Sequence, residues 1–149
     1  MDELKPFDDR LAALIASLSP ASRRKMAAEI AKQLRASQQQ RIKRQQAPNG
    51  TPYARRRQPV RGKKGRVKRE MFEKLRTHRY MKAKGSNDDA VVEFVGRVQR
   101  MARVHQEGLR DRPARYSKEV RYEIRELLGF SEADRQIVED VVISHFADS

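Results

Sequence analysis

The sequence contains no cysteine. Disulfide bonds, thiolate metal sites and cysteine nucleophiles are therefore excluded. The acidic start Met1–Leu4 lacks the basic and then apolar run of a secretory signal. No stretch approaches the roughly 20 consecutive apolar residues that a membrane-spanning helix needs. We therefore expect no contact with a membrane, and a protein that works in a cytoplasm or in a particle assembled there.

Motifs for catalysis and metal binding are also lacking. His78, His105 and His145 lie far apart and show none of the short spacings of zinc ligands. The segment Gly62–Gly65 lacks the spacing of a phosphate-binding loop, and no Gly-x-Ser-x-Gly motif occurs. We interpret His105 as a packed, hydrogen-bonded side chain near a helix end. The sequence predicts no enzyme activity, no metal and no cofactor.

Positive charge is abundant and concentrated in the middle of the chain. The net charge is +14 over 149 residues, and the segment 21–84 contains 22 Lys/Arg against three acids. The segments before and after it are net acidic. This pattern has two interpretations. One is binding of nucleic acid through its phosphates. The other is head-to-tail association, in which the basic face of one subunit meets the acidic ends of the next.

The centre of this charge is the segment Arg55–Arg69, which contains no acid and no aromatic residue. With so few apolar residues it cannot form a core element, and we expect an extended basic arm that orders on assembly. Without aromatic side chains to stack on bases, any nucleic-acid contact would be non-specific and to the backbone. The candidate assembly or DNA-facing residues are Arg55, Arg56, Arg57, Arg61, Lys63, Lys64, Arg66, Lys68 and Arg69.

Hydrophobic periodicity predicts four helices before residue 107. The first is expected over 7–18 and the second over 20 to about 46, with Ser19 as its N-cap. Apolar residues thin out after Leu34, so the second half of this helix should project from the core or pack against another chain. A short helix is expected over 68–75 and another over 98–106, ended by Gly108.

Alternation and β-branched residues predict the strands. A hairpin is expected from 78–84 and 90–95, with its tip at 87–89 and with Tyr80 and Phe94 near the core. After a polar loop over 109–118, the alternation of apolar and charged residues over 120–125 predicts a strand with one solvent-exposed face. A closing amphipathic helix over 132–146 follows Ser131, with Asp134 in its first turn.

The resulting prediction is an α+β fold with two N-terminal helices, a small antiparallel sheet, a basic extended arm and a C-terminal amphipathic helix. We expect one domain over 1–149. It would comprise a helical hairpin over 1–47, the arm over 48–69 and an α+β core over 70–149.

Several short motifs follow one another along the chain in a recognisable order and spacing. They are Asn49–Ala54, Met71-Phe72-x-x-Leu75-Arg76, Tyr80, Val95–Arg97, Ala102–Leu109 and Val120–Phe130. In this order and spacing they resemble the virion morphogenesis (tail completion) proteins of contractile-tailed bacteriophages. Glu123 and Ile124 depart from the proline and small residue that are common there.

The resemblance implies a structural subunit that completes the head-proximal end of a tail and helps it join the head. It further implies a homo-oligomeric ring in the neck of the virion, assembled in the bacterial host cytoplasm. Its partners would be the tail tube or tail terminator and the head connector proteins, with non-specific DNA contact in addition. The alternatives are a non-specific nucleic-acid-binding protein and, least favoured, an enzyme such as a nuclease.

Overall fold

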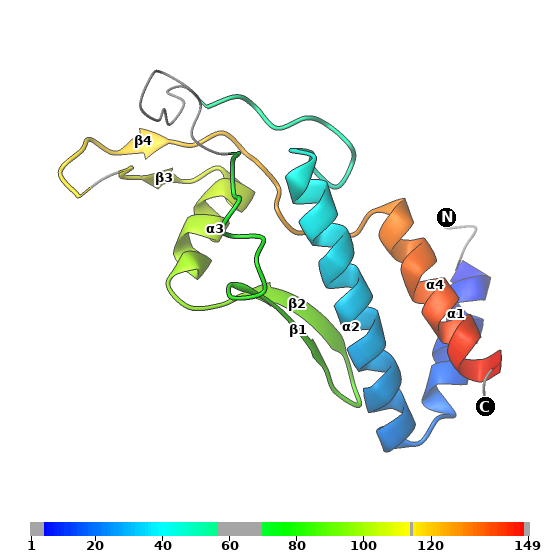
Figure 1. The fold of residues 1–149 in the computed structure, drawn as a ribbon. Coiled ribbons are helices and arrows are strands. Elements are labelled where there is room, and N and C mark those ends of the chain that lie inside the picture. Colours follow the sequence, from blue (N-terminus) through cyan, green and yellow to red (C-terminus); the bar gives the residue numbers. More distant parts are fainter. Residues whose placement is uncertain (1–4, 57–69, 114, 148–149) are drawn as a thin grey trace. The chain divides into compact units, whose positions relative to one another are not determined.

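The computed structural model describes residues 5–56, 70–113 and 115–147 (Figure 1). β1 pairs with β2, and β3 pairs with β4. This arrangement confirms the predicted α+β class. The elements in chain order are α1 (Lys5–Ala16), α2 (Pro20–Lys43), β1 (Met81–Gly85), β2 (Ala90–Phe94), α3 (Val98–Glu107), β3 (Arg110–Asp111), β4 (Val120–Arg121) and α4 (Glu132–Ala147).

The chain divides into two compact units. Unit 1 contains Met1–Leu34, Ala83–Val92 and Glu132–Ser149, and unit 2 contains Arg35–Lys82 and Glu93–Ser131. The helix α2 and the β1–β2 hairpin each contribute residues to both units. Every contact described below joins residues of the same unit.

Unit 1 is a helical layer whose core lies between α1, α2 and α4 (Figure 1). Ser19 caps α2 as predicted, because its hydroxyl accepts a hydrogen bond from the Ser22 N–H at 3.2 Å. Arg135 of α4 binds the Asp8 carboxylate of α1 at 2.5 Å. The core consists of Met26, Ile30, Val141 and Val142, surrounded by the partly buried Leu11, Ile15, Leu18, Leu34, Ala90, Ile137, Val138 and Phe146.

The hairpin meets the backbone of α2 at Gly85 in unit 1. A Cβ atom at Gly85 would lie 2.3 Å from the Ala28 nitrogen, so only glycine fits there. At the tip, the Ser86 N–H donates to the Asp89 carbonyl at 2.8 Å. The predicted hairpin and its tip are confirmed, but its first strand begins at Met81 and not at residue 78, because 78–80 form a turn. Phe94 is buried, and Tyr80 just before β1 is half-buried.

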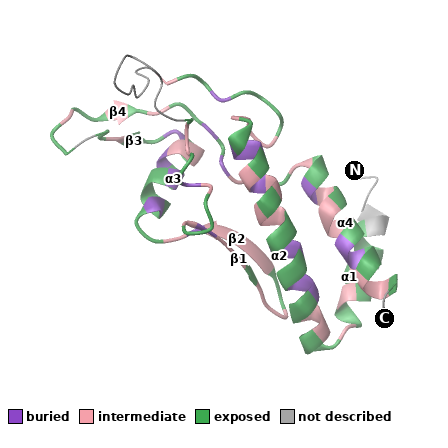
Figure 2. Ribbon diagram, in the orientation of Figure 1, coloured by how far each residue is buried: buried purple, intermediate pink, exposed green. Residues whose placement is uncertain are grey.

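The second half of α2 corrects our expectation that it projects from the core. Gln38, Arg41 and Ile42 are all buried, with Ile42 fully so. Buried positions therefore continue into the second half of α2 (Figure 2). The polar side chains are buried because they bind backbone: the Gln38 Oε1 accepts the Gly129 N–H at 3.1 Å. The Arg41 guanidinium donates to the Gly129 carbonyl at 3.3 Å. The scarcity of apolar residues after Leu34 therefore indicates that this half of α2 packs through buried polar side chains in unit 2.

The expected short helix over 68–75 is wrong for its described residues. Residues 71–76 form successive turns, and Phe72 has a left-handed φ of 65°. A right-handed helix cannot pass through such a residue. The part of this prediction on 68–69 lies outside the described residues.

The strand expected over 120–125 is shorter than predicted. Only Val120–Arg121 pairs, with β3 inside the segment that we had expected to be a polar loop. Gly108 ends α3 as predicted with a left-handed φ of 66°, which turns the chain into β3. Beyond β4 the Tyr122 N–H still donates to the Leu109 carbonyl at 3.0 Å, and the chain then binds the end of α3. There the Arg125 N–H donates to the His105 carbonyl at 2.8 Å.

Candidate assembly site at the base of the basic arm

Two of the nine predicted arm residues belong to the described part of the chain. Arg55 is exposed and Arg56 is half-buried. The other seven lie outside the described residues: Arg57, Arg61, Lys63, Lys64, Arg66, Lys68 and Arg69. The structure does describe the residues on either side of these seven, which are called the two junctions of the arm below.

The first junction, at residues 53–55, is held by the segment after β4. The Arg125 side chain is buried and donates its Nε–H to the Ala54 carbonyl at 2.8 Å. It also donates from its terminal nitrogen to the Arg55 carbonyl at 3.0 Å. The Tyr53 hydroxyl donates to the Glu126 carbonyl at 2.8 Å. The chain therefore enters the arm from a fixed position.

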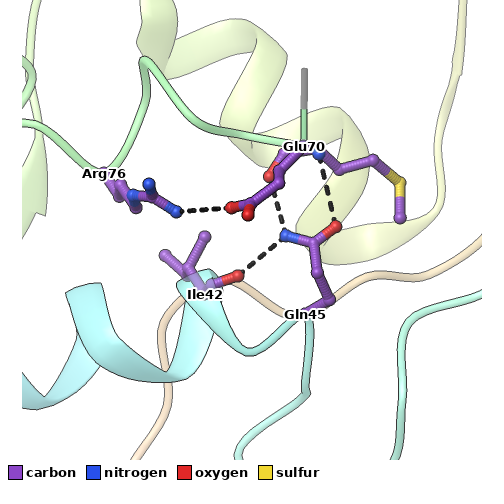
Figure 3. A network of polar contacts seen from close by, with 5 residues as sticks. Ile42, Gln45, Glu70 and Arg76 are labelled. Atoms are coloured by element: carbon purple, nitrogen blue, oxygen red, sulfur yellow. Dashed lines mark hydrogen bonds and ion pairs between the residues drawn. The ribbon is translucent and has the colours of Figure 1, made fainter. Parts of the chain in front are cut away.

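The second junction, at Met71, is held by Gln45 just after α2. The Gln45 amide donates to the Met71 carbonyl at 2.9 Å and accepts from the Met71 N–H at 3.3 Å. The same amide donates to the Ile42 carbonyl at 2.8 Å, which fixes its own orientation. Nearby, Glu70 and Arg76 form an ion pair at 3.1 Å (Figure 3).

A row of four aromatic rings connects the two junctions. The Tyr53 and Phe72 rings meet edge to face with centroids 5.6 Å apart. Phe72 then meets His105, and His105 meets Tyr122, each at 4.8 Å. Because Tyr53 and Phe72 are in contact, the described residues on either side of the arm lie close together.

The three titratable rings of the row, those of Tyr53, His105 and Tyr122, are uncharged at neutral pH. Burial, with smaller contributions from Arg125 and Arg56, lowers the pKa of His105 to about 4. Burial raises the pKa of Tyr53 to about 12, and burial together with Asp111 raises that of Tyr122. The His105 ring is therefore neutral and acts as an aromatic spacer.

The interpretation of His105 as a packed side chain fits this geometry, but its hydrogen bonding differs from our expectation. Its buried Nδ1 has no hydrogen-bond partner among the residues that the structure describes. Within those same ranges, no group of three or more His, Asp or Glu residues could hold a metal ion. In the described ranges, no helix is long and apolar enough to cross a membrane.

Beside the aromatic row lies a cleft of about 720 Å³. Its apolar lining comes from the residues after the arm and from α3, and charged side chains surround it. The lining residues are Arg56, Glu70, Met71, Phe72, Glu73, Lys74, Leu75, Tyr80, Val98, Met101, His105, Pro113, Val120, Arg121, Tyr122, Glu123 and Arg125. A volume of this size accommodates several side chains of a partner.

The chain after Arg125 is held by a second glutamine, Gln106 of α3. Its Oε1 accepts the N–H groups of Leu127 and Leu128 at 2.8 and 3.0 Å. Its Nε2 donates to the Leu128 carbonyl at 2.8 Å. With the contacts of Gln38 at Gly129, these bonds fix the segment 125–129 in place. Sequence analysis missed these roles because glutamines on a helix usually face solvent.

Comparison with known proteins gives a match along almost the whole chain. Residues 2–147 match the phage virion morphogenesis family. The chain is 48% identical over 147 residues to tail completion protein S of Escherichia phage P2, covering 97% of this chain and 98% of that protein. No solved structure matches the chain.

Proposed function

Since the chain belongs to the phage virion morphogenesis family, we propose that it is a structural subunit that completes a phage tail. The observation that carries this proposal is the 48% identity to tail completion protein S over nearly the full length of both proteins. At such identity over a whole domain, fold and assembly role generally persist together.

We further propose that the subunit acts at the head-proximal end of the tail as part of a homo-oligomeric ring that aids head–tail joining. A ring needs heterologous contacts, and a chain with a basic middle and acidic ends offers surfaces of opposite charge for them. Its neighbours would be the tail tube or tail terminator and the head connector proteins, in the neck of the virion.

The described part of the site supports a structural role rather than a catalytic one. His105 is neutral, and both ends of the arm are fixed by backbone hydrogen bonds from Arg125 and Gln45. Such an arrangement positions a segment for contact with another molecule. The nine cations Arg55–Arg69 would then bind a neighbouring protein or line a channel for DNA.

Electron microscopy of lysates tests this function. The gene is disrupted in the source phage or prophage and complemented in a control. We expect full heads and separate, unjoined tails that complementation restores to joined particles. Joined particles of normal appearance in the disrupted lysate would contradict the proposal.

The arm is tested by complementation with a variant in which its nine Arg/Lys residues become Gln. We expect correct folding by circular dichroism and a loss of head–tail joining. A control variant neutralises four exposed cations of α2 outside the arm: Arg24, Lys25, Lys32 and Lys43. Equal joining by the arm variant and the control would exclude a role for the arm.

The high charge also favours a second candidate, non-specific binding of nucleic acid. If six phosphates are neutralised, affinity should fall about 10³-fold between 50 and 200 mM salt. This function would become the main one if the lysates showed normal particles while the arm variant lost DNA binding.

A further inference from the structure

The β3–β4 hairpin has two arginines that face each other across its strands. Its ladder pairs Arg110 with Arg121 and Asp111 with Val120. Arg110 and Arg121, which we call the arginine pair, are both exposed, and within the described ranges neither side chain has a hydrogen-bond or ion-pair partner. Like charges directly opposite each other destabilise an antiparallel ladder. The arginine pair therefore fits an anion that binds both guanidinium groups.

The acids near the arginine pair do not neutralise it. The Asp111 carboxylate already binds Arg100 of α3 at 3.2 Å. Because successive residues of a strand point to opposite faces, Asp111 lies on the other face of the ladder from the arginine pair. Glu119 and Glu123 are exposed, and in the described part of the chain neither forms an ion pair. Over 110–123 these two acids stand against five cations, so the hairpin is net positive.

The loop that joins β3 to β4 adds further cations and an exposed aromatic ring. Arg112, Arg115 and Lys118 are all exposed. Tyr116 is 90% exposed, and the Arg115 guanidinium lies over its ring at 5.5 Å from the centroid. Within unit 2 the hairpin extends past α3 (Figure 1). The loop is therefore open to contact with a large molecule.

We propose that the β3–β4 hairpin binds the sugar–phosphate backbone of duplex DNA. The arginine pair would hold one phosphate between its guanidinium groups, which donate several hydrogen bonds to phosphate oxygens. Arg112 and Lys118 would bind neighbouring phosphates, and the Tyr116 hydroxyl can donate to another. The proposal rests on the DNA contact in the proposed function and gives this contact a site outside the arm.

The surface of the hairpin favours DNA over an acidic protein. Protein–protein interfaces have an apolar core, whereas protein–DNA interfaces are polar and strongly positive. Among the described residues of 110–121, Tyr116 is the one large apolar or aromatic side chain that is exposed. Binding should not depend on the base sequence, because phosphates are the same at every base pair.

Fluorescence anisotropy of a short labelled duplex measures the contribution of the arginine pair. The variant Arg110→Gln/Arg121→Gln loses two phosphate contacts. The slope of log K against log salt should become about 1.8 less steep, which weakens binding about 60-fold at 0.1 M salt if the affinities converge at 1 M. The matched control Arg24→Gln/Arg44→Gln removes the same charge from two exposed arginines, one in α2 and one just after it. It should bind nearly like the native chain.

Three binding results would overturn the proposal. The first is no binding of the duplex by the native chain at 50 mM salt. The second is equal weakening in the arginine-pair variant and the control. The third is binding of polyglutamate that depends on the arginine pair and is tighter than binding of the duplex, which would assign the pair to an acidic protein.

Thermal unfolding separates binding from folding. Removal of a like-charge pair should leave the melting temperature of the free chain unchanged or slightly higher, while DNA binding falls. A lower melting temperature together with weaker binding would mean that the two arginines support the hairpin itself, and would contradict the proposed role.

Acetylation of lysines locates the contact on the native chain. Lys118 is exposed in the loop of the hairpin, and Lys25 is exposed on α2. Duplex DNA should protect Lys118 from acetylation, measured by mass spectrometry, and leave Lys25 reactive. Equal protection of the two lysines, or no protection of Lys118, would exclude the hairpin as the site.

These tests separate the DNA contact from the tail role. Unjoined tails in the disrupted lysate, with DNA binding that does not depend on the arginine pair, would leave the tail role intact and remove this site. Normal particles in the lysate, with DNA binding lost in the arginine-pair variant, would keep the site and remove the tail role.

Discussion

Removal of the Gln106 amide should destabilise unit 2 far more than removal of an exposed glutamine. The variant Gln106→Ala leaves three backbone groups of Leu127 and Leu128 without the partner that now binds them. Leu127 is fully buried, so water cannot replace the lost bond to its N–H. Leu128 is half-buried, and solvent can partly satisfy its two groups.

The expected cost follows from these exposures. A buried unsatisfied N–H costs about 1–3 kcal/mol, and each partly solvated hydrogen bond contributes about 0.5 kcal/mol or more. Gln106→Ala should therefore lower the free energy of unfolding by about 2–4 kcal/mol. In a chain of this size this corresponds to roughly 4–16 °C in the melting temperature. Gln106→Met keeps most of the side-chain volume and should lose nearly as much, because the polar contacts dominate.

Urea and thermal unfolding followed by circular dichroism measure this cost. Gln136→Ala is the matched control, because Gln136 is an exposed glutamine of α4 whose amide donates to the Asp140 carboxylate at 2.8 Å. We expect it to cost less than about 0.5 kcal/mol. A loss for Gln106→Ala no larger than that of the control would refute the proposed role of the amide.

Three further predictions concern single residues. Because the pKa of His105 is lowered to about 4, its neutral state stabilises the fold above pH 6.5, and this contribution is lost as the pH falls towards 4. For a half-buried ring we expect about 1–2 kcal/mol, and His105→Phe should remove this part of the pH dependence in urea titrations between pH 7 and 4. Gly85→Ala should cost about 2–3 kcal/mol, because its Cβ would meet the α2 backbone, and a melting temperature like that of the native chain would contradict the close packing. Arg125→Met should free the arm junction and accelerate tryptic cleavage after Arg55 about tenfold, measured by mass spectrometry, whereas an unchanged rate would exclude the anchoring role.

Much of the secondary structure was predictable because local rules decide it. The N-cap at Ser19, the left-handed end of α3 at Gly108 and the hairpin tip before Ala90 each follow from one or a few neighbouring residues. The periodicity of 132–146 likewise predicts α4, whose Val141 and Val142 are in the core of unit 1.

The wrong secondary-structure and packing predictions concern segments whose conformation is set by contacts with residues distant in the sequence, and not by local hydrophobic spacing. Residues 71–75 have helical spacing, but Gln45 binds both backbone groups of Met71, and Phe72 adopts a left-handed conformation. The second half of α2 looks like a solvated face until its long polar side chains meet the backbone near Gly129. No spacing rule encodes such partners, because they are distant in the sequence.

The candidate site was only partly predictable for the same reason. The arm is visible from composition alone, and Tyr53 and Phe72 flank it in the sequence. Their contact, the row through His105 to Tyr122, and the cleft arise only when the chain folds. A polar side chain on a helix can be recognised as a backbone anchor only once its partner is known.

The groups that fix the loops of unit 2 have one consequence for the use of this protein in experiments. Gln45 and Gln106 are uncharged amides, and they bind uncharged backbone groups. Such bonds are not screened by dissolved ions, unlike interactions between exposed charges. The surface charge and the contacts made by these two amides are therefore largely separable, whereas the loops bound by Arg41 and Arg125 depend on buried charged groups. The electrostatic character of the molecule can be altered across a wide range of buffers and substitutions while these two amides keep their geometry.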